Sequence, residues 1–411
     1  MANVSSSNGL EKRPKLRFPG FDGPIKSAHL SQYLVENKER NKNLIYTKSD
    51  VLSVSGEYGI INQIEFQGRS FAGESVAEYH VVETNDIVYT KSPLKANPYG
   101  IIKVNNGAPG IVSTLYAVYH PCEGTVAEYI DYYFGNDLRL NKYLKPLVNI
   151  GAKHDMKVNN ETVLTGEVYF PGYSEQKKIV GFLTILDERI RQQRNLVEAL
   201  KKYKRGVMQH IFRRTTTQSV KAWTCVRLGD IFKKVSRRNT DGLVKNVITN
   251  SAEYGLIPQR DFFDKDIAVD GNTANYYVIE KGDFVYNPRK SNTAPYGPFN
   301  RYTLDEKGII SPLYTCLVLK ADIYPSYLAW YFKSDAWHRY IYDNGSQGVR
   351  HDRVSMTDDL LMGIPVIFPD QAKQQEYADI LDKIDARLQA AQKVYDLLIK
   401  EKCGYMQQLF I

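Results

Sequence analysis

Two stretches of this sequence carry side chains that suit contact with nucleic acid. Lys91–Tyr99 (KSPLKANPY) and Asn287–Asn292 (NPRKSN) place Lys, Arg, Asn and Tyr on segments stiffened by proline. Lys and Arg reach phosphates or the O6 and N7 atoms of guanine, and Asn pairs with adenine. Ordinary solvated loops also contain these residue types, so DNA binding is a hypothesis at this point.

A second pair of segments, Gly151–Asp155 (GAKHD) and Gly348–Asp352 (GVRHD), carries the pattern Gly-x-[Lys/Arg]-His-Asp. A His-Asp pair can bind a metal, but no further His accompanies it and the neighbouring Lys or Arg opposes a cation. Either these segments contact phosphates or bases, or they are turns held by Asp. The candidate DNA-binding residues are therefore Lys91, Lys95, Tyr99, Lys153, His154, Arg289, Lys290, Tyr296, Arg350 and His351.

No motif assigns a reaction to the chain. The sequence contains neither a Walker A motif nor GxGxxG. Asn97-Pro98-Tyr99 lacks the second proline of the Asn-Pro-Pro-aromatic loop of amino-methyltransferases. Glu36-Asn37-Lys38 has the E-x-K spacing of some nucleases without a preceding Pro-Asp pair. We expect no catalytic residue and no metal ligand in this chain.

The composition is that of a globular protein of two or three domains, with 411 residues, 43% hydrophobic and 24% charged residues. The net charge of +8 favours anionic partners only mildly. The four cysteines are far apart and form no CxxC, which favours a reducing compartment. Residues 1–24 have no apolar core of a signal peptide, and no apolar run is long enough to span a bilayer. We expect a soluble, cytoplasmic protein.

The sequence repeats itself at an offset of 196 to 198 residues. Glu57-Tyr58-Gly59 returns as Glu253-Tyr254-Gly255, and Pro98-Tyr99-Gly100 returns as Pro295-Tyr296-Gly297. YIDYYFGND (Tyr129–Asp137) matches YLAWYFKSD (Tyr327–Asp335). Many matches in the same order indicate a tandem duplication of a unit far longer than a solenoid repeat.

Each repeat ends in a segment with helical periodicity over several heptads. Apolar residues recur in steps of four and three from Ile179 to Ile211, and the same positions return 198 residues later, from Tyr377 to Leu409. The first segment predicts a helix roughly 55 Å long. We expect the two helices to pair and to bind partners through Leu183, Leu186, Ile190, Leu381, Ile384 and Leu388.

Before its long helix, each repeat predicts a short helix, a strand-rich region, a further helix and a final short strand. The short helices are expected at Ser27–Asn41 and Trp223–Asn239, and the later helices at Glu128–Leu144 and Ser326–Tyr342. The predicted organisation is a tail (1–24), a domain (25–173), a long helix (174–212), a connector (213–222), a domain (223–370) and a long helix (371–411). The predicted fold class is α+β, with two tandem globular domains separated by a pair of long antiparallel coiled-coil helices in pseudo-two-fold symmetry.

This arrangement resembles the DNA-specificity (S) subunit of type I restriction-modification systems. The resemblance covers about Lys15 to Ile411 and is carried by Lys15–Pro19, Arg227–Asp230, Gly308–Tyr314, Phe170–Asp187 and Phe368–Asp385. The first repeat departs from the pattern, with Leu30-Ser31-Gln32 in place of Leu-Gly-Asp and Ser113-Thr114-Leu115 in place of Ser-Pro-Leu.

The resemblance implies two target-recognition domains, each of which reads one half of a bipartite asymmetric site on double-stranded DNA. It implies that the long helices fix the spacer and dock two methyltransferase (M) subunits. Two restriction (R) subunits, an ATP-driven translocase and nuclease, join the larger complex. It also implies that this chain binds no cofactor, while the partners use S-adenosylmethionine, and ATP with Mg²⁺.

Two other functions remain open from the sequence. The first is a recognition module of a single-chain restriction and methylation enzyme, which requires methyltransferase motifs that we do not find in this chain. The second is a coiled-coil scaffold without a DNA role. Salt-dependent DNA binding would exclude the scaffold, because phosphate contacts weaken steeply as salt rises.

Overall fold

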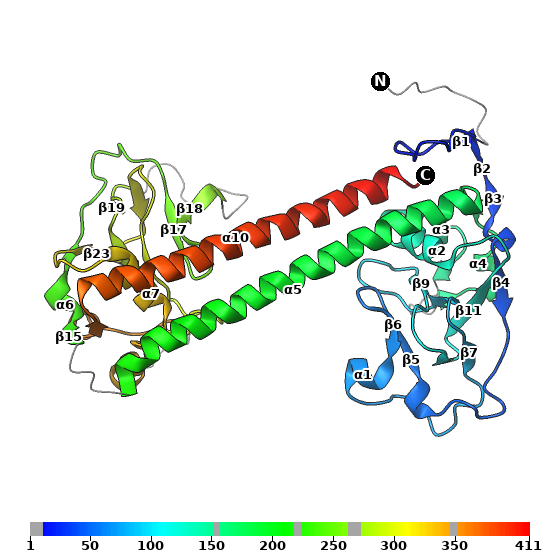
Figure 1. The fold of residues 1–411 in the computed structure, drawn as a ribbon, viewed down its shortest axis with the longest axis horizontal. Helices are drawn as coiled ribbons and strands as arrows, with labels where there is room; N and C mark the ends of the chain where they lie inside the picture. The colour runs from blue at the N-terminus through cyan, green and yellow to red at the C-terminus, as the bar shows by residue number, and fades with distance from the viewer. Residues whose placement is uncertain (1–10, 151–155, 218–222, 262–272, 346–351) are drawn as a thin grey trace. The chain divides into compact units, whose positions relative to one another are not determined.

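A computed structural model describes residues 11–150, 156–217, 223–261, 273–345 and 352–411. The chain forms two compact units (Figure 1). The first contains Met1–Arg194 together with Lys393–Ile411, and the second contains Asn195–Gln392. Each long helix therefore contributes one part to each unit.

The two units contain the same antiparallel four-stranded sheet. In the first unit the strand order is β4 (Leu34–Asn37), β11 (Tyr116–Pro121), β8 (Ile87–Thr90) and β9 (Ile102–Val104). In the second unit it is β16 (Phe232–Val235), β23 (Thr315–Leu319), β20 (Phe284–Tyr286) and β21 (Phe299–Arg301). Strands β8 and β20 are buried along their whole length, which explains their continuous runs of β-branched and aromatic residues.

Smaller strand pairs flank each sheet. The first unit has the pair β7 (His80–Val82) with β10 (Gly110–Val112) and the hairpin β5 (Leu52–Ser55) with β6 (Gly59–Asn62). The second unit has β19 (Tyr277–Ile279) with β22 (Gly308–Ile310) and the hairpin β17 (Ile248–Ser251) with β18 (Gly255–Pro258). The strand-rich region predicted for each repeat is thus present.

The short helices expected at Ser27–Asn41 and Trp223–Asn239 are wrong. Each segment is mainly extended, with only a single helical turn, η1 (Leu30–Gln32) or α6 (Leu228–Ile231), before strand β4 or β16. The residues after the turn, LVEN and FKKV, pair with the central strands β11 and β23. The pairing with a neighbouring strand, which is a tertiary contact, overrides the helical interpretation of these residues.

The helices expected at Glu128–Leu144 and Ser326–Tyr342 are each broken into two. They form α2 (Ala127–Phe134) and α3 (Asp137–Leu144), and α7 (Pro325–Lys333) and α8 (His338–Asn344). Asn136 caps α3 by accepting a hydrogen bond from the Arg139 amide. Ser334 ends α7 because its hydroxyl donates to the Tyr331 carbonyl. Polar residues at the breaks therefore start and stop these helices.

The long helices are α5 (Tyr173–Thr217) and α10 (Gln371–Gln408). The predicted start of the connector, at residue 213, is wrong, because α5 continues through Thr217. Residues 213–217 are Arg and Thr, so this segment has no helix-breaking Gly or Pro. Within the first unit, Phe182 contacts Tyr405 and Asp187 pairs with Lys402, so the two helices run antiparallel there. The α+β class with two domains and long paired helices is confirmed.

The long helices also belong to the domain cores. Tyr129 and Tyr133 pack against Phe410, which directly follows α10, in the core of the first unit. In the second unit, Tyr327 and Tyr331 pack against Phe212 of α5. Each domain is thus closed by the far end of the other repeat's helix. No helix among the described residues is both long and apolar enough to cross a membrane.

Candidate nucleic-acid interface

The two loops predicted to contact DNA lie between equivalent strands, β8 and β9 in the first unit and β20 and β21 in the second. Both are anchored in the same way. The hydroxyl of Tyr89 donates to the carbonyl of Tyr99 at 2.7 Å, and the hydroxyl of Tyr286 donates to the carbonyl of Tyr296 at 2.9 Å. The repeated Tyr residues therefore hold both loops in one frame.

The glycine of each Pro-Tyr-Gly motif completes this frame. Gly100 has φ +89° and Gly297 has φ +83°, a region that side chains disfavour. A Cβ atom on either glycine would lie 2.0 Å from a backbone oxygen, that of Thr90 or that of Asn287. The glycine of the motif is thus a structural requirement of the loop.

In the first unit, the predicted residues lie at different depths. Lys95 is exposed, whereas Lys91 and Tyr99 are half-buried. Burial lowers the pKa of Lys91; the nearby charge of Glu36 opposes this shift, and that of Arg40 adds to it. Burial also lowers the pKa of His80 to about 4, and the charges of Arg40 and Lys91 act in the same direction. Arg40 and Lys91 therefore disfavour a positive charge on this imidazole.

In the second unit, Arg289 is exposed, while Lys290 and Tyr296 are half-buried. The loop is joined to the segment that follows the second Gly-x-Arg-His-Asp motif. The Lys290 amide donates to the Asp352 carbonyl at 2.9 Å, and the Val354 amide donates to the Pro288 carbonyl at 2.9 Å. Two segments far apart in sequence thus form one surface.

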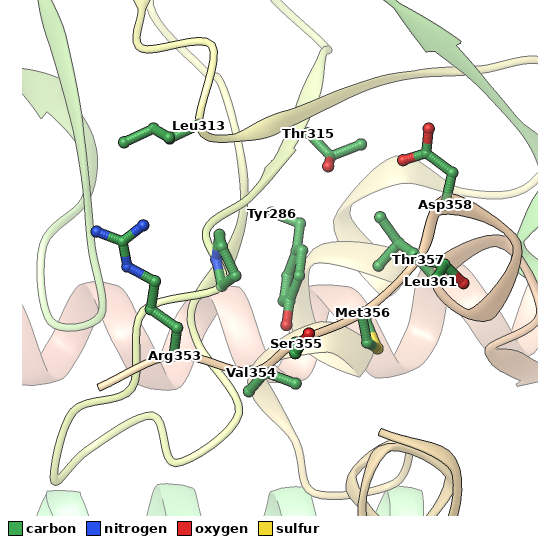
Figure 2. A pocket seen from close by; sticks show the side chains of 11 residues that line it. Tyr286, Leu313, Thr315, Arg353, Val354, Ser355, Met356, Thr357, Asp358 and Leu361 are labelled. Carbon is green, nitrogen blue, oxygen red and sulfur yellow. The ribbon is translucent and has the colours of Figure 1, made fainter. Parts of the chain in front are cut away.

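Two cavities lie along this surface. One, of about 360 Å³, is shown in Figure 2 and is lined by Tyr286, Pro288, Leu313, Thr315, the segment 353–358 and Leu361. The other, of about 500 Å³, is lined by Lys290, Tyr296, Tyr342, Asp352 and neighbouring residues. The predicted loop and the segment beginning at Asp352 contribute to both cavities.

The cavity in Figure 2 combines hydrogen-bond donors with apolar contacts. Arg353 and Leu313 lie on one side of it, and Thr357 and Asp358 lie on the other. The Asp358 carboxylate pairs with Lys234 at 2.5 Å. A guanidinium and hydroxyls beside exposed apolar carbon can bind a planar polar ring at its edge.

Sequence reasoning missed Arg353, Leu313 and Thr315. Arg353 directly follows the repeated His-Asp motif, and its counterpart in the first repeat is Met156, so a comparison of the repeats could have singled it out. The predicted residues Lys153, His154, Arg350 and His351 lie outside the described residues.

The residues predicted for helix packing differ in burial. Leu183 and Leu381 are fully buried and belong to the cores of the first and second units, respectively. Leu186 and Ile384 are each 8% exposed, and Ile190 and Leu388 are half-buried. Near its N-terminal end, each long helix is therefore packed into the core of the domain that precedes it in the sequence.

Among the described residues, no group of three or more His, Cys, Asp or Glu side chains could hold a metal ion. The charged side chains at the bases of the long helices are instead paired with each other. Lys402 and Asp187 lie 2.5 Å apart in the first unit, and Lys204 and Asp385 lie 2.5 Å apart in the second. Each of these lysines thus has a carboxylate partner on the other long helix.

No family model and no curated protein matches the sequence. Solved structures do match it in fold. The crystal structure of the type I restriction-modification system S subunit from M. genitalium aligns with a TM-score of 0.57 and 14% identity, over 97% of this chain and 99% of that chain. A chain from a structural study of assembly and conformational transition of the type I R-M system aligns with a TM-score of 0.52 and 16% identity, over 97% and 99%. The chain therefore has the fold of a type I restriction-modification specificity subunit.

Proposed function

We propose that this chain is the DNA-recognition subunit of a type I restriction-modification complex, in which each unit reads one half of a bipartite asymmetric site. The observation that carries the proposal is the pair of loops held by the same Tyr hydroxyl contact and the same Pro-Tyr-Gly turn. Their frames agree, but their exposed cations differ: Lys95 in one and Arg289 in the other. Two domains that recognise different DNA sequences require a shared loop backbone that carries different exposed side chains.

The long helices would fix the distance between the two half-sites and dock two methyltransferase subunits, and two restriction subunits would join the full complex. Each helix is anchored in a domain core at both ends, through Leu183 and Phe212 in α5, and through Leu381 in α10 and Phe410 directly after it. A spacer anchored in this way resists bending at its ends. S-adenosylmethionine, and ATP with Mg²⁺, would be bound by the partner subunits, and the reaction would take place there.

The test is to co-express the chain with its methyltransferase partner and to map methylated bases across the host genome. A split motif with a fixed spacer supports the proposal. A short continuous motif, or no methylation above the partner alone, refutes it. Binding of the purified complex to duplex DNA at increasing salt provides a second measurement, because phosphate contacts predict a steep loss of affinity.

A further inference from the structure

Several positions that line the cavity beside Tyr286 carry different residues in the first unit. At offsets of 197 and 198 residues, Arg353 corresponds to Met156 and Thr315 corresponds to Ala117. Met156 is 8% exposed and Ala117 is fully buried, and both belong to the apolar core of the first unit. The positions of Arg353 and Thr315 are thus buried and apolar in the first unit, whereas they line a cavity in the second.

Part of the apolar lining has apolar counterparts in the first unit. Tyr286 and Leu361 line the cavity, and the corresponding Tyr89 and Val163 belong to the core of the first unit. Other lining positions change in chemistry: Arg353 and Thr315 correspond to Met156 and Ala117, and Pro288 and Val354 correspond to Lys91 and Lys157. A site that serves stability alone has no need for this difference, whereas a site that distinguishes one DNA sequence from another does.

Arg353 is held in position for such a role. Its backbone bridges to that of Arg289, and the next residue, Val354, donates to the Pro288 carbonyl at 2.9 Å. Its side chain is 26% exposed, so it remains accessible from the cavity. The backbone of Arg353 is therefore fixed to the loop, which reduces the entropy lost when a ligand binds.

The guanidinium has unused hydrogen-bonding capacity. The Nε atom of Arg353 is buried and has no hydrogen-bond acceptor, although an Asp352 carboxylate oxygen lies 3.5 Å away. On the opposite wall, Asp358 is engaged by Lys234. A buried donor without an acceptor is unfavourable, so an incoming acceptor gains more here than at a solvated arginine.

We propose that the cavity beside Tyr286 receives the major-groove edge of a guanine in the half-site read by the second unit, and that Arg353 recognises it. This inference rests on the proposed function. An arginine guanidinium can donate two hydrogen bonds to one guanine, one to O6 and one to N7. Leu313, which is 58% exposed at the cavity, offers apolar contact to an adjacent base.

A phosphate is a poorer occupant of this cavity. The sugar-phosphate backbone is the same in both half-sites, so a phosphate contact at this place would be useful to both units. The first unit has Met156 there, which binds no phosphate. The exposed Arg289, outside the lining of this cavity, is the better candidate for a phosphate contact.

The experiment uses the complex of the full chain with its methyltransferase partner and compares methylation motifs for Arg353→Met and Arg353→Lys. The Met variant introduces the residue of the first repeat. It is expected to leave the first half-site unchanged and to lower discrimination at one guanine of the second half-site by about 5- to 150-fold. Lysine keeps the charge without the fork, so it is expected to reduce discrimination less.

Arg339→Met is the matched control, because Arg339 loses the same charge but is 80% exposed and pairs with Asp343 on α8. It is expected to leave the motif unchanged. A second half-site without a G·C pair overturns the inference, and so does an Arg353→Met motif identical to that of the wild type. Uniformly weaker methylation without a change of motif indicates a phosphate contact and overturns it as well. Failure of the proposed function is distinct, since the wild-type complex would then show no split motif.

Discussion

At the bases of the long helices the two units use the same side chains, whereas at the loop ends of their sheets they use different ones. Gln176 accepts from the Val126 amide and donates to the Pro171 carbonyl; Gln374 repeats both bonds with Tyr324 and Pro369. At the loop ends, Met156 stands where the other unit has Arg353. The duplicated chain has kept its attachment points and changed the loop ends of its sheets, where we propose that DNA binds. Within one molecule, the comparison separates what the fold needs from what specificity needs.

The largest effect is expected from exchanging the residue that differs most. Met156→Arg should lower the free energy of unfolding of the first unit by about 3 kcal/mol, because a guanidinium enters an apolar core without a partner. Arg353→Met should change the second unit by less than about 1 kcal/mol, since it removes a donor that lacks an acceptor. Hydrogen exchange of peptides from each unit, measured against denaturant, checks both. If Met156→Arg and Arg353→Met destabilised their units equally, the difference in environment between a buried Met156 and a cavity-lining Arg353 would be contradicted.

Next in size are the two glutamines that the units share. Gln176→Leu and Gln374→Leu should each destabilise their own unit by about 2 kcal/mol, because a backbone N–H and a backbone C=O lose their partners. The measurement is the amide protection of Val126 in the first variant and of Tyr324 in the second. A large effect in one unit and none in the other would break the equivalence of the attachments.

His80 should make the stability of the first unit depend on pH, as the half-buried His338, whose pKa burial also lowers, should in the second unit. Burial, with the charges of Arg40 and Lys91, lowers the pKa of His80 from 6.5 to about 4, whereas its counterpart in the second unit is Tyr277. Below pH 6.5 the unfolded chain takes up a proton that the folded unit does not, so stability falls as pH falls from 6.5 towards 4. His80→Gln should remove about 1–2 kcal/mol of this pH dependence. Thermal unfolding of the wild type and of His80→Gln at pH 7.5, 6 and 4.5 tests this prediction. The same dependence of Tm on pH in the two proteins would contradict it.

The smallest effect is expected at the paired lysines. Lys204→Met and Lys402→Met should each cost about 0.5–1 kcal/mol, because the ion pairs with Asp385 and Asp187 are partly solvated. The charge exchange Lys204→Asp with Asp385→Lys should recover most of the loss. Denaturation midpoints at low and high salt measure this. A loss that does not respond to salt would assign the effect to packing instead.

The sequence was sufficient for the features that periodicity and internal repetition determine. The helical seam of α5 and α10 and the duplication are both visible in the order of residues, because burial of one helix face requires regular apolar spacing. The entry helices failed because Leu30 and Leu228 begin only one turn before a strand pairs with its neighbour. That pairing depends on residues some 80 positions away in the chain.

The candidate site was predicted only in part, for a similar reason. The loops were found from residue type, but Arg289 and Arg353 meet through a backbone pairing between distant segments. Nothing local in the sequence shows that Arg353 lines a cavity while Met156 is buried in a core. Burial depends on how distant segments pack, so it becomes visible only when both segments are placed.

The split of the long helices between the units also constrains the order of synthesis. The core of the first unit contains Leu409 and Phe410, and the amide of Leu16 donates to the Gln408 carbonyl. The ribosome must therefore make the entire second unit before the first can close. During that interval Tyr129 and Tyr133 lack their contacts with Phe410 and expose apolar surface. Such an incomplete domain is expected to bind chaperones until the C-terminal end of the chain is made.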